Sequence, residues 1–195
     1  MNKRNLILIG FVMVVLAQLA VPAWMILERE RTLREGQVFK FKTQPVDPAD
    51  PFRGRYVWLR LEPETVPVSD AGVWASRQKA FAVLGTGTNG YAMVKRLERT
   101  KPKGEPALQV RVNWSDGKNM HINWEGLNRY YMMEDKAPVA EAAYREHNRA
   151  ANQNCFITVR VRGSVGVIEN LYIENQPIQT WLREHKGKTE ERLRP

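Results

Sequence analysis

A long apolar segment at the start of the chain constrains what this sequence can form more than any other feature. Residues 6–27 are apolar and are interrupted only by Gly10, Gln18 and Pro22. At roughly 1.5 Å of rise per helical residue, this segment spans about 33 Å, which is enough for the hydrocarbon core of a bilayer. The sequence therefore predicts a single transmembrane helix, with residues 1–35 as a membrane anchor and short juxtamembrane helix. The lipid bilayer is the first partner that we expect.

A cleaved secretory signal is the alternative for this segment, because Val21, Pro22 and Ala23 offer small residues ahead of a cleavage point. The apolar core of a signal peptide spans about 7 to 15 residues, so the greater length here favours an uncleaved anchor. Lys3 and Arg4 precede the helix, and a long hydrophilic domain follows it. A short cationic tail stays in the cytoplasm, whereas a long domain is translocated largely regardless of its charge. We therefore predict a cytoplasmic N-terminus and an extracytoplasmic C-terminal domain.

The chain is basic, with a formal net charge of +9. Residues 1–42 hold seven lysines and arginines against three glutamates, an excess of four beside the predicted membrane. This placement suits anionic lipid headgroups. A nucleic-acid partner is not expected, because no helix-turn-helix, zinc-knuckle or RNP pattern accompanies the charge. Cys155 is the single cysteine, so no internal disulfide can form, and we expect it to be a small core residue.

Residues 36–182 are predicted to form one mainly β domain, a β-rich α+β unit. Short segments of alternating or apolar residues are bounded by turn residues, which is typical of strands, and Asp116-Gly117 is a strong hairpin signal. The polar side chains Thr158, Arg160 and Arg162 of the last hairpin are expected to face water. The predicted strands are 38–42, 56–61, 80–84, 91–97, 108–114, 120–124, 156–162 and 165–173.

Two segments of the domain favour helices. Residues 138–148 begin with a proline at a first-turn position, and residues 177–185 form a second short candidate. Residues 183–195 are charged and poor in apolar side chains, so we expect a disordered tail.

The most distinctive segment is 45–61, because three prolines at a spacing of three residues stiffen the approach to a strand. Asp47, Asp50 and Arg53 lie between and after these prolines and form a candidate recognition loop near the membrane. The alternative is structural, since Asp side chains commonly cap turns through their own backbone. A calcium site is not expected, because the loop lacks further oxygen ligands.

Here the chain resembles the GDYXXLXY family of bacterial membrane-anchored proteins. Gly54, Tyr56 and Leu59 match the motif, whereas Arg55 and Leu61 stand where the family has Asp and Tyr. The later segment 129–134 also looks like that family. The resemblance implies no known activity. It implies a single-pass protein of the bacterial inner membrane with a periplasmic domain, and a polytopic membrane protein as partner.

Two function classes remain open from the sequence. The first is a non-enzymatic binding or accessory module for an integral membrane partner. The second is a fold similar to type I signal peptidases, with Lys95 as the base. Such a dyad needs a hydroxyl beside a desolvated lysine, and only Thr43 stands near the expected place. A buried Lys95 next to Thr43 would favour the hydrolase, and an exposed Lys95 would exclude it.

No cofactor or metal is expected. Residues 85–90 spell G-x-G-x-x-G, but a strand pattern follows them in place of the helix that a dinucleotide site requires. The three histidines share no ligand spacing. We expect the tryptophans after the anchor to be core or strand-face residues rather than a sugar platform.

The predicted orientation can be tested with reporters fused after Pro195. A reporter that is active only outside the cytoplasm should give activity, because the cationic tail holds the N-terminus inside. A silent external reporter together with an active cytoplasmic one would contradict this orientation. A mature protein that begins at Trp24 would show that the anchor is cleaved.

Overall fold

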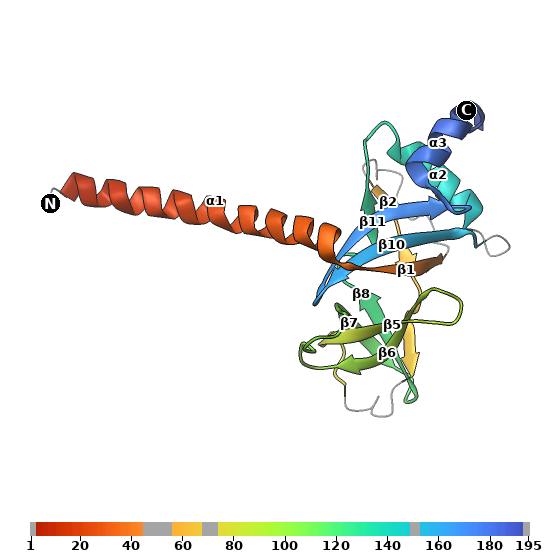
Figure 1. Cartoon of the computed structure of the whole chain (residues 1–195), viewed down its shortest axis with the longest axis horizontal. Helices are drawn as coiled ribbons and strands as arrows, with labels where there is room; N and C mark the ends of the chain where they lie inside the picture. Colours follow the sequence, from red (N-terminus) through yellow and green to blue (C-terminus); the bar gives the residue numbers. More distant parts are fainter. Residues whose placement is uncertain (1–2, 45–55, 68–73, 149–152, 193–195) are drawn as a thin grey trace.

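The computed structural model describes residues 3–44, 56–67, 74–148 and 153–192. Helix α1 (Lys3–Glu35) projects away from the rest of the chain, and the N-terminus lies far from the β domain (Figure 1). Within the described residues, α1 is the one helix that is long and apolar enough to cross a membrane, and none of its most apolar stretch is buried. Pro22 lies inside this helix.

Two antiparallel sheets and a short ribbon form the domain. The sheet next to α1, which we call the anchor sheet, contains in spatial order β12 (Gln176–Pro177), β11 (Val165–Ile173), β10 (Cys155–Arg162), β1 (Gln37–Gln44) and β3 (Arg60–Leu61). The second, the hairpin sheet, contains β4 (Thr65–Pro67), β8 (Asn119–Trp124), β7 (Ala107–Ser115), β5 (Lys79–Thr86) and β6 (Ala92–Glu98). The ribbon pairs β2 (Tyr56–Trp58) with β9 (Arg129–Tyr131).

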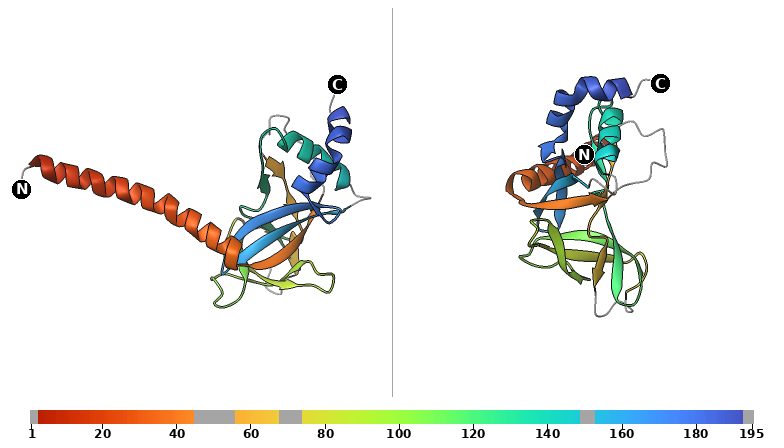
Figure 2. Two further views of the ribbon diagram at one scale, coloured as in Figure 1. Left: turned by 45° about the horizontal axis from the view of Figure 1, so that its top comes forward. Right: turned by 90° about the vertical axis from the view of Figure 1, so that its right-hand side faces the viewer.

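Helices α2 (Ala137–His147) and α3 (Ile178–Arg192) pack together at one end of the anchor sheet, on the side away from the hairpin sheet (Figures 1 and 2). Both predicted helices are therefore present. Helix α3 continues to Arg192, so most of the segment 183–195 is helical, where we expected disorder. Lysine, arginine and glutamate have high helix propensity, which favours extension of a helix that is already started by packing.

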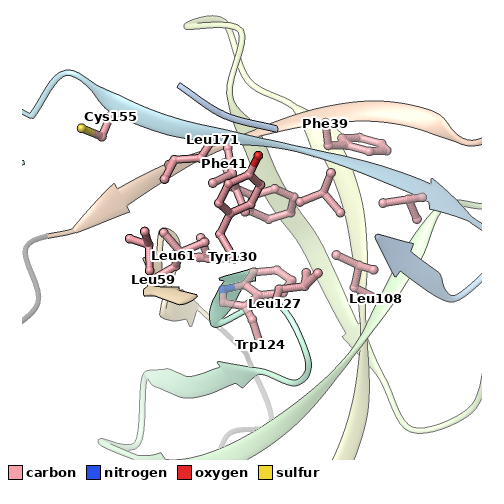
Figure 3. Packing of buried hydrophobic residues seen from close by; sticks show 14 of the residues in the cluster. Phe39, Phe41, Leu59, Leu61, Leu108, Trp124, Leu127, Tyr130, Cys155 and Leu171 are labelled. Atoms are coloured by element: carbon pink, nitrogen blue, oxygen red, sulfur yellow. The ribbon is translucent and has the colours of Figure 1, made fainter. Parts of the chain in front are cut away.

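The core lies between the two sheets. Phe39 and Phe41 of β1 stand opposite Val159 and Ile157 of β10, and all four side chains are buried. The Phe41 ring meets the edge of Trp124 from the hairpin sheet, with centroids 5.1 Å apart. Figure 3 shows Phe41 in the middle of this cluster. The prediction of a mainly β domain after the N-terminal helix is thus confirmed.

The hairpin predicted at Asp116-Gly117 is present as β7–β8, and the last hairpin is present as β10–β11. The predicted strands 80–84 and 91–97 also pair, as β5–β6. In the β7–β8 turn, the Asp116 carboxylate accepts hydrogen bonds from the Asn119 side chain and from the backbone N–H groups of Asn119 and Lys118. These bonds hold the pKa of Asp116 at about 2. The turn chemistry that predicted this hairpin therefore operates as expected.

The predicted strand 56–61 is two strands with different partners. Tyr56 to Trp58 pair with β9, whereas Arg60 and Leu61 pair with the end of β1. Leu59 lies between them, and its N–H donates to the carbonyl of Asn128. Apolar alternation alone could not show this division, because it identifies extended chain and not the neighbour with which each part pairs.

Helix α1 passes into β1 through Gly36 alone. The Gly36 N–H donates to the Thr32 carbonyl at 2.9 Å, and Thr32 is fully buried. A Cβ at Gly36 would collide with the Thr32 carbonyl and lie 3.1 Å from the Val161 backbone nitrogen. The end of the helix therefore lies directly against β10, which a side chain at this position would prevent.

Of the three side chains that we expected to face water, Thr158 is buried, Arg160 is partly buried and Arg162 is exposed. The pairing of β10 with β11 shifts register after Thr158, which interrupts the regular alternation of faces. Both arginines also bind the end of α1. Arg162 forms an ion pair with Glu35 at 3.0 Å. Arg160 pairs with Glu169 at 2.8 Å and donates to the Gly36 carbonyl. Because the end of α1 lies against the C-terminal end of β10, the polar side chains there bind the helix.

Substituting Gly36 should test this junction. Gly36→Ala should destabilise the domain by about 1–3 kcal/mol, because the new Cβ meets backbone that has to shift. Gly10→Ala, within α1, is the control for the same substitution, since a Cβ there has nothing within 4 Å. Urea denaturation of the detergent-solubilised chain measures both, and equal stability of the two variants would contradict a close-packed junction.

Candidate functional site: an aromatic ribbon and the groove beside it

The β2–β9 ribbon carries a cluster of surface aromatic side chains. Strand pairing places Tyr56 opposite Tyr131, Val57 opposite Tyr130 and Trp58 opposite Arg129. Val57 and Tyr130 are buried, because side chains alternate between the two faces of a strand. Their neighbours therefore point outward.

An arginine organises these outward side chains. The Arg129 guanidinium lies 5.1 Å from the centroid of the Tyr56 ring and 5.4 Å from that of Trp58. The Tyr56 and Tyr131 rings meet edge to face at 5.7 Å, and Tyr131 is 66% exposed. We call Tyr56, Trp58, Arg129 and Tyr131 the aromatic ribbon.

The composition of this surface is typical of binding sites between proteins. Tyrosine, tryptophan and arginine dominate the residues that contribute most to such interfaces. Met133, which follows β9, adds a further side chain that is 58% exposed. Helix α2 packs against β2 and supports the ribbon from the domain side. The aromatic ribbon is thus a surface held in place by buried neighbours.

A groove of about 450 Å³ adjoins the ribbon, and Trp58 belongs to both. Its walls come from the chain around β3 and from the far end of the β7–β8 hairpin. The lining residues are Trp58, Leu59, Arg60, Leu61, Glu64, Asn113, Trp114, His121, Ile122, Asn123, Trp124 and Asn128.

The walls of the groove are fixed by contacts among its own residues. Arg60 and Glu64 form a two-pronged ion pair with distances of 2.7 and 2.6 Å. The Trp114 indole stacks on the His121 ring, with centroids 3.7 Å apart and 15° between the planes. The Trp124 N–H donates to the Pro63 carbonyl at 3.0 Å. These contacts leave few ways for the lining to rearrange.

The structure separates the family-motif positions that the sequence indicated. Tyr56 is part of the aromatic ribbon, whereas Leu59 is buried in the core and stabilises the fold. Gly54 lies outside the described residues, as do Asp47, Asp50 and Arg53 of the candidate recognition loop. Their predicted roles stay predictions.

The described residues do not assemble the dyad of the hydrolase hypothesis. Lys95 is exposed on β6, where its aliphatic chain lies over Gly85. Thr43 is fully buried on β1 and donates its hydroxyl to the Cys155 carbonyl at 3.0 Å. Burial also raises the pKa of the Cys155 thiol to about 12, so at neutral pH this cysteine is no thiolate nucleophile. Within the described ranges, no group of three or more His, Cys, Asp or Glu side chains is placed to hold a metal ion.

Fold and site together define a chain with one long N-terminal apolar helix and an antiparallel β domain that displays a cluster of aromatic side chains at its surface. The chain belongs to the GDYXXLXY protein family, whose model matches residues 18–169. No curated protein and no solved structure matches it. The family resemblance rests on two segments of the sequence, and the described strands from them, β2 and β9, pair with each other.

Sequence reasoning missed Trp58 and Arg129 as surface residues, and it missed the groove. The alternation of Tyr56 with Trp58 and of Arg129 with Tyr131 was a usable signal, because each pair must share a strand face. The groove had no comparable signal, since its two walls come from segments that are distant in the sequence, one before residue 65 and the other after residue 112.

Proposed function

We propose that this protein is a membrane-anchored accessory module that acts by binding and not by catalysis. In this proposal α1 spans the bacterial inner membrane with its N-terminus in the cytoplasm. The β domain lies in the periplasm and binds an extracytoplasmic part of a polytopic membrane protein. The aromatic ribbon is the contact surface.

The observation that carries the proposal is the surface cluster on the β2–β9 ribbon, in which Arg129 and Tyr131 are exposed and Tyr56 and Trp58 are partly exposed. Large aromatic side chains and arginine gain binding energy at little entropic cost when neighbouring rings already restrict them. A stacked guanidinium also stays charged and keeps donors free for carbonyl or carboxylate groups of a partner.

The junction at Gly36 supports a partner in the same membrane. Eight residues, 28–35, lie between the end of the apolar segment at Leu27 and Gly36, and the rise from Leu27 to Gly36 is about 14 Å at roughly 1.5 Å per residue. The helix then enters the sheet without a flexible linker. A domain held this close to the bilayer meets the short loops of a polytopic neighbour more readily than distant soluble proteins.

Photo-crosslinking in membranes tests the proposed surface. A photoreactive phenylalanine derivative at Tyr131 should give an adduct with an integral membrane protein, identified by mass spectrometry. The matched control places the same group at Met93, which is 45% exposed on β6 of the hairpin sheet. The adduct at Tyr131 should disappear when Arg129→Ala and Trp58→Ala are combined.

The candidate recognition loop supplies a second arm of this experiment. The triple substitution of Asp47, Asp50 and Arg53 by alanine should leave the domain folded and abolish the adduct if these charges orient the partner. If the aspartates only shape the turn, stability should fall by about 1 kcal/mol for each while the adduct survives. Equal adducts at Tyr131 and Met93, or none at Tyr131 in folded protein, would contradict the proposal.

A further inference from the structure

One residue of the groove, Trp114, is not part of the aromatic ribbon. A β-bulge in strand β7 turns its indole outward. Pairing of β7 with β8 shifts register between Val112 and Trp114, where Asn113 is the additional residue. Without this bulge, regular alternation would bury Trp114 on the same face as Val112. Instead Trp114 is 55% exposed and stands opposite His121. Such bulges commonly re-aim a side chain at a functional site.

The Trp114 ring is fixed in its plane yet open on one side. His121 covers one face of the indole as a parallel stack. The His121 ring is itself held by a contact of 3.4 Å between its Nδ1 and the Thr65 hydroxyl. Among the described residues no other ring stacks on Trp114. Trp114 lines the groove and is 55% exposed, so its indole offers a flat apolar surface to a ligand.

Three asparagines line the same groove as Trp114: Asn113, Asn123 and Asn128. The structure gives none of the three amide groups a hydrogen-bond partner within the described part of the chain, and each carries two donors and an acceptor. The Arg60–Glu64 pair adds further donors and acceptors at fixed positions. The groove therefore combines hydrogen-bond donors and acceptors with the apolar surface of the Trp114 indole.

The charge and shape of the groove argue against three classes of ligand: charged small molecules, lipid chains and extended peptides. Arg60 and Glu64 neutralise each other, so neither an anion nor a cation is favoured. Leu59, Leu61 and Ile122 are buried in the core, which leaves little exposed aliphatic surface for a lipid chain. The neighbouring edge strand β4 is three residues long and includes Pro67, so it is a poor template for an added peptide strand.

We propose that this groove binds a neutral saccharide. The apolar face of a sugar ring lies on the Trp114 indole, and its hydroxyl or acetamido groups bond to the Asn113, Asn123 and Asn128 amides. Arg60 and Glu64 supply a donor and an acceptor at the rim. A volume of about 450 Å³ lies within the range typical of small-molecule sites. This inference is tested separately from the protein partner, because Trp114 is not part of the aromatic ribbon, although Trp58 lies at the boundary of both.

Titration of the full-length chain with defined trisaccharides tests the inference. The protein is kept in a zwitterionic detergent without a sugar headgroup, because a maltoside would compete. Maltotriose, cellotriose and tri-N-acetylchitotriose are the probes, followed by tryptophan fluorescence and calorimetry. At least one should bind with a dissociation constant at or below about 1 mM.

Three variants locate the bound sugar. Trp114→Ala and Asn123→Ala should each weaken binding by about tenfold or more, equivalent to about 1.4 kcal/mol. Tyr131→Ala is the matched control, since it removes an exposed aromatic ring from the ribbon and should leave sugar affinity unchanged. Both aromatic residues are exposed, so circular dichroism should show an unaltered fold.

The inference is overturned if folded wild-type protein binds none of the three sugars, or if Trp114→Ala and Asn123→Ala both bind as tightly as the wild type. A loss caused by Tyr131→Ala alone would likewise overturn it, because the sugar would then lie on the ribbon. Failure of the membrane crosslink at Tyr131 leaves these outcomes unaffected, so the two proposals are tested separately.

Discussion

The pairing of β1 with β10 is the interaction on which the rest of the structure depends. Strand β1 follows the anchor helix after one glycine, yet it lies inside the anchor sheet with β10 on one side and β3 on the other. Six consecutive residues of β1, from Gln37 to Lys42, pair with β10. Strand β10 comes from near the end of the chain, so its pairing with β1 joins the two ends of the domain. Because β1 directly follows α1, the same pairing also holds α1 against the domain.

The same strand decides where the binding surfaces lie. Its last residues pair with Leu61 and Arg60, which holds β3 at the sheet edge and turns Leu59 into the core. The preceding residues are then free to pair with β9, so Tyr56 and Trp58 face outward. The groove forms between this edge and the β7–β8 hairpin. The aromatic ribbon and the groove are therefore consequences of how the segment 56–61 is divided between β9 and β1.

Much of this architecture follows from local chemistry in the sequence. The length of the apolar segment, the Asp116-Gly117 turn and the alternation around Ile157 each predict an element that the structure contains. What the sequence could not show depends on distant contacts. The division of 56–61 requires knowledge of β9, and the exposure of Trp114 requires the bulge at Asn113. The outward face of Arg160 likewise becomes a docking surface only because the end of α1 lies beside it.

The central claim is that anchor and domain form one rigid unit, which holds the aromatic ribbon in a fixed orientation near the bilayer. Spin labels at the exposed positions Arg31 of α1 and Met93 of β6 test it by pulsed electron resonance in lipid nanodiscs. A close-packed junction predicts a single narrow distribution of distances between the two labels. A broad distribution, as given by a flexible tether, would contradict the account.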